Sequence, residues 1–422
     1  MTFSKFGKKF TRANGITQLM EDLGNANSAN NPDLIMLGGG NPAIVPESHA
    51  AFVNELQHLI SSTEVDHMMG LYDGSLGNDE FRRTLATSLN EQYDWDLDID
   101  NIALSNGSQS SFFGLFNLLA GEMAEGSARK ILFPLAPEYV GYADQGLSED
   151  MFISIKPSIH LFEENGSKQF KYEIDFDALK AQLASATEFG AICVSRPTNP
   201  TGNVITDAEL ETLNLLAKEY DIPLIIDNAY GHPFPGTIYT DATLMWNSNT
   251  ILCMSLSKLG LPGLRTGIII ANKTIINAMS RLNGTMILAP SSVGPTLMTR
   301  LIKEKQLSPL CDDVIKPYYQ QKAATAVTLF NEIFSDMPVY LHKLEGAFFM
   351  WLWFKDMGIN SEALYEKLKE ESVYVIPGHN FFIGIDENWQ HQHQCIRINY
   401  AKDEAVLRKG LETIKRVISE WD

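Results

Sequence analysis

Residues 251–265 read ILCMSLSKLGLPGLR. The apolar run over 251–254 predicts a buried strand that ends near two serines and Lys258, and a turn rich in glycine and proline follows. Arg265 lies seven residues after the lysine. A lysine at the end of a buried strand is desolvated, which lowers its pKa and favours the neutral amine. The alternative is a lysine whose stem lies on apolar surface while its amine reaches solvent.

A neutral amine can attack a carbonyl group and form a Schiff base, so Lys258 is a candidate nucleophile. The Ser255 hydroxyl and the planar guanidinium of Arg265 are groups that suit a phosphate. A ligand that carries both an aldehyde and a phosphate is pyridoxal 5′-phosphate (PLP). The stretch therefore predicts PLP as the cofactor.

The flanking sequence alternates apolar, strand-like runs with amphipathic, helix-like segments. Near-continuous apolar strands of this kind indicate an α/β fold with a mainly parallel sheet that is covered on both faces. Polar residues follow several of the runs, at the strand ends where such sheets bind ligands. The runs cover residues 102–105, 131–133, 191–194, 222–226, 251–254 and 267–271.

After about residue 285 the pattern changes to long helical stretches and then to mixed strands and helices, which predicts a smaller α+β domain. We expect residues 1–50 to form an N-terminal arm and part of the small domain. Residues 51–320 would form the large PLP-binding domain, and residues 321–422 the C-terminal small domain.

The composition is that of an ordinary globular protein, with 45% apolar and 20% charged residues among 422. A net charge of −19 disfavours nucleic acid and anionic membranes as partners. Four cysteines without CxxC spacing suggest reduced thiols, and no apolar run is long enough to span a membrane. We expect a cytoplasmic protein. His391 and His393 suggest a metal site, but we interpret them as surface residues and predict no metal.

Further groups that PLP requires stand after the other strand-like runs. The turn at Gly107, followed by Ser108 and Gln109, would direct free N–H groups at a phosphate. Asp227 could bind the ring nitrogen, and two tyrosines could contact the ring. Alternatively, the aspartate caps a helix and the tyrosines lie at the edge of the core. The tyrosines are Tyr139, for stacking, and Tyr230, for the phenolic oxygen.

Five motifs together resemble the fold-type I PLP-dependent aminotransferases, and the resemblance covers nearly the whole chain. It implies a large domain with a mainly parallel, seven-stranded-type sheet and a smaller α+β domain. The motifs are SNGSQ at 105–109, PTNPTG at 197–202, DNAY at 227–230, SLSK at 255–258 with Arg265, and RINY at 397–400.

The resemblance also implies roles for individual residues. Lys258 would form the Schiff base and move the substrate proton, while Asn199 would assist Tyr230 at the phenolic oxygen. Arg397 would clamp the substrate carboxylate, assisted by Asn199 and the Gly40 backbone. Tyr72 would reach the phosphate of a neighbouring subunit, which implies a homodimer. Tyr139 stands where some members have a tryptophan on the PLP ring.

Three longer stretches are most similar to bacterial members that exchange an amino group between valine and pyruvate, giving 2-oxoisovalerate and alanine with ping-pong kinetics. An apolar pocket for valine would include Ile16, Tyr72 and Tyr139. The alternatives are an aminotransferase of other specificity, a PLP-dependent β-lyase or decarboxylase, and a DNA-binding regulator, which the net charge disfavours. The stretches are residues 195–204, 254–263 and 377–382.

Overall fold

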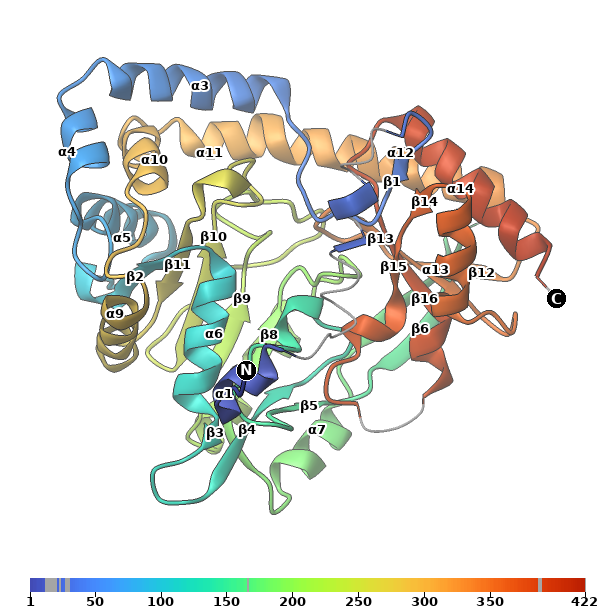
Figure 1. Cartoon of the computed structure of the whole chain (residues 1–422), viewed down its shortest axis with the longest axis horizontal. Helices are drawn as coiled ribbons and strands as arrows, with labels where there is room; N and C mark the ends of the chain where they lie inside the picture. Colours follow the sequence, from blue (N-terminus) through green and yellow to red (C-terminus); the bar gives the residue numbers. More distant parts are fainter. Residues whose placement is uncertain (12–20, 23, 27–30, 165–166, 386–388, 422) are drawn as a thin grey trace.

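The computed structural model describes residues 1–11, 21–22, 24–26, 31–164, 167–385 and 389–421. Two β-sheets form its centre, and helices pack around them (Figure 1). Two short strands share the outer edge of β4, so the eight strands of the larger sheet fill the seven positions that the resemblance implies. The order is β2 (Ile102–Ser105), β11 (Gly267–Ile270), β10 (Thr250–Ser255), β9 (Leu224–Asp227), β8 (Glu188–Ser195) and β4 (Ala128–Phe133), followed by β3 (Gly121–Glu122) and β5 (Phe152–Ser154).

Most neighbouring strands of this sheet are parallel, as predicted. β10, β9, β8, β4 and β5 run in one direction, and β11 is antiparallel to both of its neighbours. The register pairs Ser195 with Asp227 and Asp227 with Cys253. The carboxyl ends of three strands therefore coincide, and the polar residues that end or follow them lie together at one edge.

Alternate residues of the strands contribute to two separate hydrophobic cores, one on each face of the sheet. Along β9, Ile225 joins one core, while Leu224 and Ile226 join the other. The first core includes buried residues of α6 and α9, and the second those of α5, α8 and α10. These helices are α5 (Asp79–Tyr93), α6 (Ser108–Leu119), α8 (Asp207–Glu219), α9 (Lys273–Met286) and α10 (Val293–Lys303).

The second sheet combines strands from both halves of the chain. The hairpin of β6 and β7 falls within the range predicted for the large domain, yet β7 pairs with β12 in this sheet. The division into domains remains a prediction, because strand pairing links the two ranges. The order is β15 (Ile376–Pro377), β16 (Cys395–Asn399), β13 (Phe349–Phe354), β12 (Val339–His342), β7 (Ser167–Glu173) and β6 (Ser158–Glu164).

The N-terminal part of the chain lies against the C-terminal part. Strand β1 (Ile35–Met36) pairs with β14 (Val373–Tyr374), and Asn399 N–H donates to Leu37 O at 2.7 Å. In Figure 1, α13 and α14 lie on the right beside the second sheet, and α3 crosses the top with α12. Other helices are α1 (Lys5–Lys9), α3 (Pro46–Ile60), α4 (Glu64–Gly70), α7 (Phe176–Leu183), α11 (Leu307–Pro309), α12 (Lys316–Phe334), α13 (Ser361–Glu370) and α14 (Glu404–Ser419).

Within the described ranges, no helix is both long and apolar enough to cross a membrane. The four cysteines are free and buried, as expected of reduced thiols. The interpretation of His391 as a surface residue is wrong: it is buried against Trp353 and Trp389, and its Nε2 lies 2.5 Å from the Tyr172 hydroxyl. No group of three or more potential metal ligands occurs in the part of the chain that the structure describes.

Candidate active site

A cavity of about 200 Å³ lies where the carboxyl ends of β8, β9 and β10 meet the N-terminus of α6. Its walls combine polar and aromatic side chains. Sixteen residues line it: Asn41, Ser108, Gln109, Phe112, Tyr139, Ser195, Pro197, Asn199, Asp227, Ala229, Tyr230, Ser255, Ser257, Lys258, Pro262 and Arg265. The cavity thus brings together most of the residues that the sequence predicts.

Lys258 points into this cavity rather than to solvent, since its Nζ donates to Gly40 O at 2.8 Å. The amine also lies 5.4 Å from the centre of the Tyr230 ring. Burial, and then the nearby charge of Arg397, lower the pKa of Lys258 to about 8, although Asp227 opposes the shift. The predicted fall in its pKa is confirmed, and a substantial fraction of the amine is neutral near pH 8.

A group of hydrogen-bond donors lies around Gly107. This glycine has a φ of +90°, and a Cβ there would stand 2.3 Å from Nη2 of Arg265. The absence of a side chain lets Arg265 approach the N-terminus of α6, whose first N–H groups belong to Ser108 and Gln109. Ser255 lines the same part of the cavity. Backbone amides, hydroxyls and a guanidinium together form a site that fits a phosphate.

Asp227 is buried at the end of β9 and does not cap a helix, so the capping interpretation is wrong. Its Oδ1 accepts the Ala229 N–H at 3.0 Å, and its Oδ2 accepts the Tyr142 hydroxyl at 2.5 Å. Burial raises the pKa of Asp227, and these hydrogen bonds oppose the rise. The carboxyl group faces the cavity and fits a protonated ring nitrogen.

Tyr230 and Tyr139 both line the cavity. Tyr230 is buried, and its hydroxyl has no hydrogen-bond partner within the described residues. A buried hydroxyl without a partner costs free energy, which an acceptor on a bound ligand would recover. The phenolic oxygen of PLP is such an acceptor. This unpaired hydroxyl, the lysine, the carboxyl group and the phosphate site together fit PLP.

Arg397 lies on β16, beside the cavity rather than in its wall. Its Nη1 donates to Asn199 Oδ1 at 2.8 Å and its Nη2 to Gly38 O at 2.6 Å, while Nε has no partner among the described residues. Burial lowers its pKa to about 10, so it stays charged at neutral pH. No carboxylate in the described ranges forms an ion pair with it, which leaves a buried cation suited to an anionic ligand.

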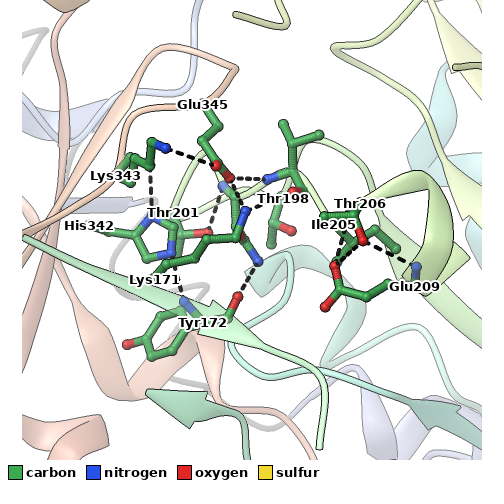
Figure 2. A network of polar contacts seen from close by, with 12 residues as sticks. Lys171, Tyr172, Thr198, Thr201, Ile205, Thr206, Glu209, His342, Lys343 and Glu345 are labelled. Atoms are coloured by element: carbon green, nitrogen blue, oxygen red, sulfur yellow. Dashed lines mark hydrogen bonds and ion pairs between the residues drawn. The ribbon is translucent and has the colours of Figure 1, made fainter. Parts of the chain in front are cut away.

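The turn that carries Asn199 is held by residues of the second sheet and its loops. Lys171 Nζ lies 2.5 Å from Glu345 Oε2, and the same oxygen accepts the Val204 N–H at 3.1 Å. Lys171 also donates to Val204 O at 3.1 Å. Figure 2 shows this pair beside Thr198.

Some residues of the site are not evident from the sequence. Lys171 and Glu345 are distant from every motif, and only the strand pairing brings them together. Glu138 and Tyr142 are buried next to Asp227 and Ser195. A glutamate two residues after the apolar run at 131–136 is the one signal that could have indicated a buried carboxyl group there.

Four predicted site residues lie outside the cavity wall: Gly40, Tyr72, Gly107 and Arg397. Tyr72 is 82% exposed in the loop after α4, so it reaches no phosphate within its own chain. Gly40 contributes its carbonyl to Lys258 but is not among the lining residues. Ile16, a predicted pocket residue, lies outside the described residues.

The family model for aminotransferase class I and II matches residues 152–414. Valine–pyruvate aminotransferase of Escherichia coli (strain K12) is 50% identical over 418 residues, which cover 99% of this chain and 98% of that protein. Aspartate aminotransferase of Pyrococcus abyssi is 25% identical over 92% of each chain.

Solved structures give the same result. A putative amino-acid aminotransferase of Psychrobacter arcticum 273-4 has a TM-score of 0.97 at 45% identity, over 100% of this chain and 99% of that one. Valine–pyruvate aminotransferase of Salmonella typhimurium LT2 has a TM-score of 0.87 at 48% identity, over 96% and 98%. The chain therefore belongs to the class I and II aminotransferases, PLP-dependent enzymes of fold type I, as its motifs predict.

Proposed function

We propose that this enzyme transfers the amino group between valine, or a similar aliphatic amino acid, and pyruvate. The observation that carries the proposal is full-length similarity, at 50% identity, to an enzyme named for this reaction. The cavity supports it, because a lysine amine and a buried carboxyl group lie in its wall and a buried arginine of the second sheet lies beside it.

We assign each predicted site residue a role within this reaction. Ser108, Gln109, Ser255 and Arg265 would hold the phosphate of PLP, with Gly107 keeping the approach open. The ring would be held by four residues: Tyr139 on its face, Asp227 at its nitrogen, and Asn199 and Tyr230 at its phenolic oxygen. When bound, PLP supplies an aldehyde that accepts the amino group and a ring that withdraws electrons from the substrate α-carbon.

Lys258 is the residue that we assign to proton movement. Its Nζ lies inside the cavity, held by Gly40 O, and its pKa of about 8 makes a neutral amine available near neutral pH. The neutral Nζ can take the proton from the substrate α-carbon, and the resulting ammonium can return it elsewhere on the reacting group. Asp227 stabilises positive charge in the same cavity while this happens.

The substrate carboxylate would bind Arg397. The unpartnered Nε and the two bonded Nη atoms present a planar set of donors, and Asn199 fixes one side of it. An aliphatic side chain would then contact Tyr139 and Tyr72 of a partner subunit, with Ile16 as the third predicted contact. One methylene is worth only about 1–3 kcal/mol in such a pocket, so we expect neighbouring aliphatic amino acids to react as well.

An exposed apolar patch supports a homodimer. Met69, Leu71, Tyr72, Met286 and Leu288 are all exposed. Hydrogen bonds hold the loop after Tyr72 against the segment that carries Met286 and Leu288. Ser75 bonds to Ser280 and Asn283 on α9, and Asp73 bonds to Ser292. A second copy of the chain that covers the patch would bring its Tyr72 toward the neighbouring site.

We also propose the cytoplasm as the location, because all four cysteines are free thiols.

A screen of amino donors with pyruvate as acceptor tests the proposal, with alanine formation as the readout. We expect valine and other aliphatic donors to react fastest. Much faster reaction with glutamate or aspartate would contradict the valine assignment and leave the aminotransferase assignment intact. Release of ammonia and pyruvate from cystathionine, without an oxo-acid acceptor, would instead favour a β-lyase.

A further inference from the structure

A second buried carboxyl group, Glu138, lies behind Asp227. It is 1% exposed, and its backbone N–H donates to Phe381 O at 2.9 Å. No lysine, arginine or histidine of the described residues pairs with it. A carboxylate buried without a cation is unfavourable, whereas a protonated carboxyl group costs far less to bury.

Both oxygens of Glu138 contact Ser195, at the end of β8. Oε1 accepts the Ser195 N–H at 2.9 Å, and Oε2 lies 2.5 Å from Ser195 Oγ. The Ser195 Oγ is in turn 3.4 Å from the Tyr142 hydroxyl, which lies 2.5 Å from Asp227 Oδ2. The four side chains therefore form one continuous line that ends on the carboxyl group facing the cavity.

The number of hydroxyl hydrogens determines which group donates and which accepts in each hydrogen bond along this line. Tyr142 has a single O–H, and an ionised Asp227 can only accept it. If Glu138 is ionised, Ser195 must donate its only O–H to Glu138, and the contact between Ser195 and Tyr142 has no hydrogen. If Glu138 is protonated, its own O–H can donate to Ser195, and Ser195 can donate to Tyr142. Every O–H then points toward Asp227.

We propose that Glu138 is a positioning residue that stays protonated and, through Ser195 and Tyr142, keeps Asp227 ionised and directed at the cofactor ring. This role rests on the PLP site proposed above. It goes beyond that site because Glu138 and Tyr142 lie outside the cavity wall.

The surroundings of Glu138 support a bound proton. Burial raises the pKa of Glu138 to about 8; the hydrogen bonds from Ser195 oppose the rise, and the charge of Asp227 adds a smaller increase. The other titratable side chains that interact with it are Tyr142 and Cys193, and burial raises the pKa of each, so they are neutral at pH 7. Because burial also raises the pKa of Asp227, its ionised form depends on the donors that it receives.

Infrared spectroscopy of the PLP-loaded enzyme tests the proton directly. The difference between wild type and Glu138→Gln should show the C=O stretch of a protonated carboxylic acid at pH 6.5. This band should disappear as the pH rises through about 8. Carboxylate bands at pH 6.5, without the acid band, would overturn the proposal.

Cofactor binding by the apoenzyme tests the positioning. Glu138→Gln keeps an acceptor for the Ser195 N–H and a donor for its Oγ, so PLP affinity should stay within about twofold of wild type. Glu138→Ala breaks the line, and affinity should fall about tenfold, since a hydrogen bond to a charged group is affected. Equal losses in the two variants would refute a protonated Glu138.

Tyr142→Phe keeps the ring that packs on Phe133 and removes only the hydroxyl. PLP affinity should fall about tenfold, and the absorbance of the bound ring should change with pH in a range where wild type is constant. Tyr172→Phe is the matched control, because Tyr172 on β7 is equally buried and its hydroxyl bonds to Trp351 on β13 and to His391, away from the cavity. Equal loss of PLP affinity in both variants would overturn the proposal.

These results separate two failures. If wild type does not bind PLP, the proposed cofactor site fails. If wild type binds PLP but Glu138→Gln behaves like Glu138→Ala, or the acid band is absent, only the role of Glu138 fails.

Discussion

Replacing Lys171 with methionine should destabilise the fold and weaken substrate binding together. The Lys171 and Glu345 side chains are only 15% and 5% exposed and form an ion pair (Figure 2). The lysine also donates to Val204 O. Removing one partner of a buried pair costs about 3–5 kcal/mol, because the other charge remains in a dry site. Because Lys171 is the more exposed partner of the pair, we expect a loss near the lower limit of this range, about 3 kcal/mol in the free energy of unfolding.

Urea unfolding of Lys171→Met measures this loss. Lys343→Met is the matched control, because Lys343 is 3.9 Å from the same carboxyl group but 43% exposed. We expect the control to change the free energy of unfolding by at most about 0.5 kcal/mol. Adding Glu345→Gln to Lys171→Met should recover part of the loss, since it removes the unpaired buried charge.

The functional effect follows from the turn between β8 and α8. Val204 and Asn199 share this turn, and Asn199 holds Nη1 of Arg397. We therefore expect the KM for valine to rise several-fold in Lys171→Met while kcat changes less. If Lys171→Met unfolded at the same urea concentration as Lys343→Met and kept the wild-type KM, the reasoning would be refuted.

Three further outcomes are expected. Because the pKa of Lys258 falls to about 8 in the folded chain, the unfolded chain binds more protons above that pH. The free energy of unfolding of the apoenzyme should therefore rise, relative to Lys258→Met, from about pH 8 to pH 10, by at most about 1.4 kcal/mol per pH unit. Gly107→Ala should lower PLP affinity in equilibrium titration, since its Cβ would displace Arg265; unchanged affinity would argue against the phosphate site. Arg397→Lys should raise the KM for valine about tenfold or more in steady-state kinetics, because the planar donor set is lost; an unchanged KM would place the carboxylate elsewhere.

The sheet and its ligand edge could be predicted because they depend on local signals. Apolar runs ending in polar residues indicate buried parallel strands, and the register then brings Asp227 and the Lys258 turn to one edge. Gly107 was predictable because a glycine between a strand and a helix permits close approach to an anion. Asn199 and Arg397 required the family resemblance, since an isolated asparagine or arginine gives no such signal.

The contacts between distant segments could not be predicted. The pairing of β7 with β12 depends on which exposed edge each hairpin meets, which no local pattern specifies. The Lys171–Glu345 pair arises only after these strands are in place, and the line from Glu138 to Asp227 requires β8 and β9 to pair in the larger sheet. The sequence predicts His391 at the surface because its neighbours in the chain are polar, whereas Trp353 and Trp389, which bury it, come from other positions.

The most direct test of the account is the rate of Lys258→Ala with valine and pyruvate, measured with PLP present. The account predicts a loss of about 1,000-fold or more, because the group that moves the α-proton is removed. It also predicts partial recovery of the rate when a small primary amine is added to the assay. A purified, folded Lys258→Ala enzyme that formed alanine at the wild-type rate would contradict the central role of this amine.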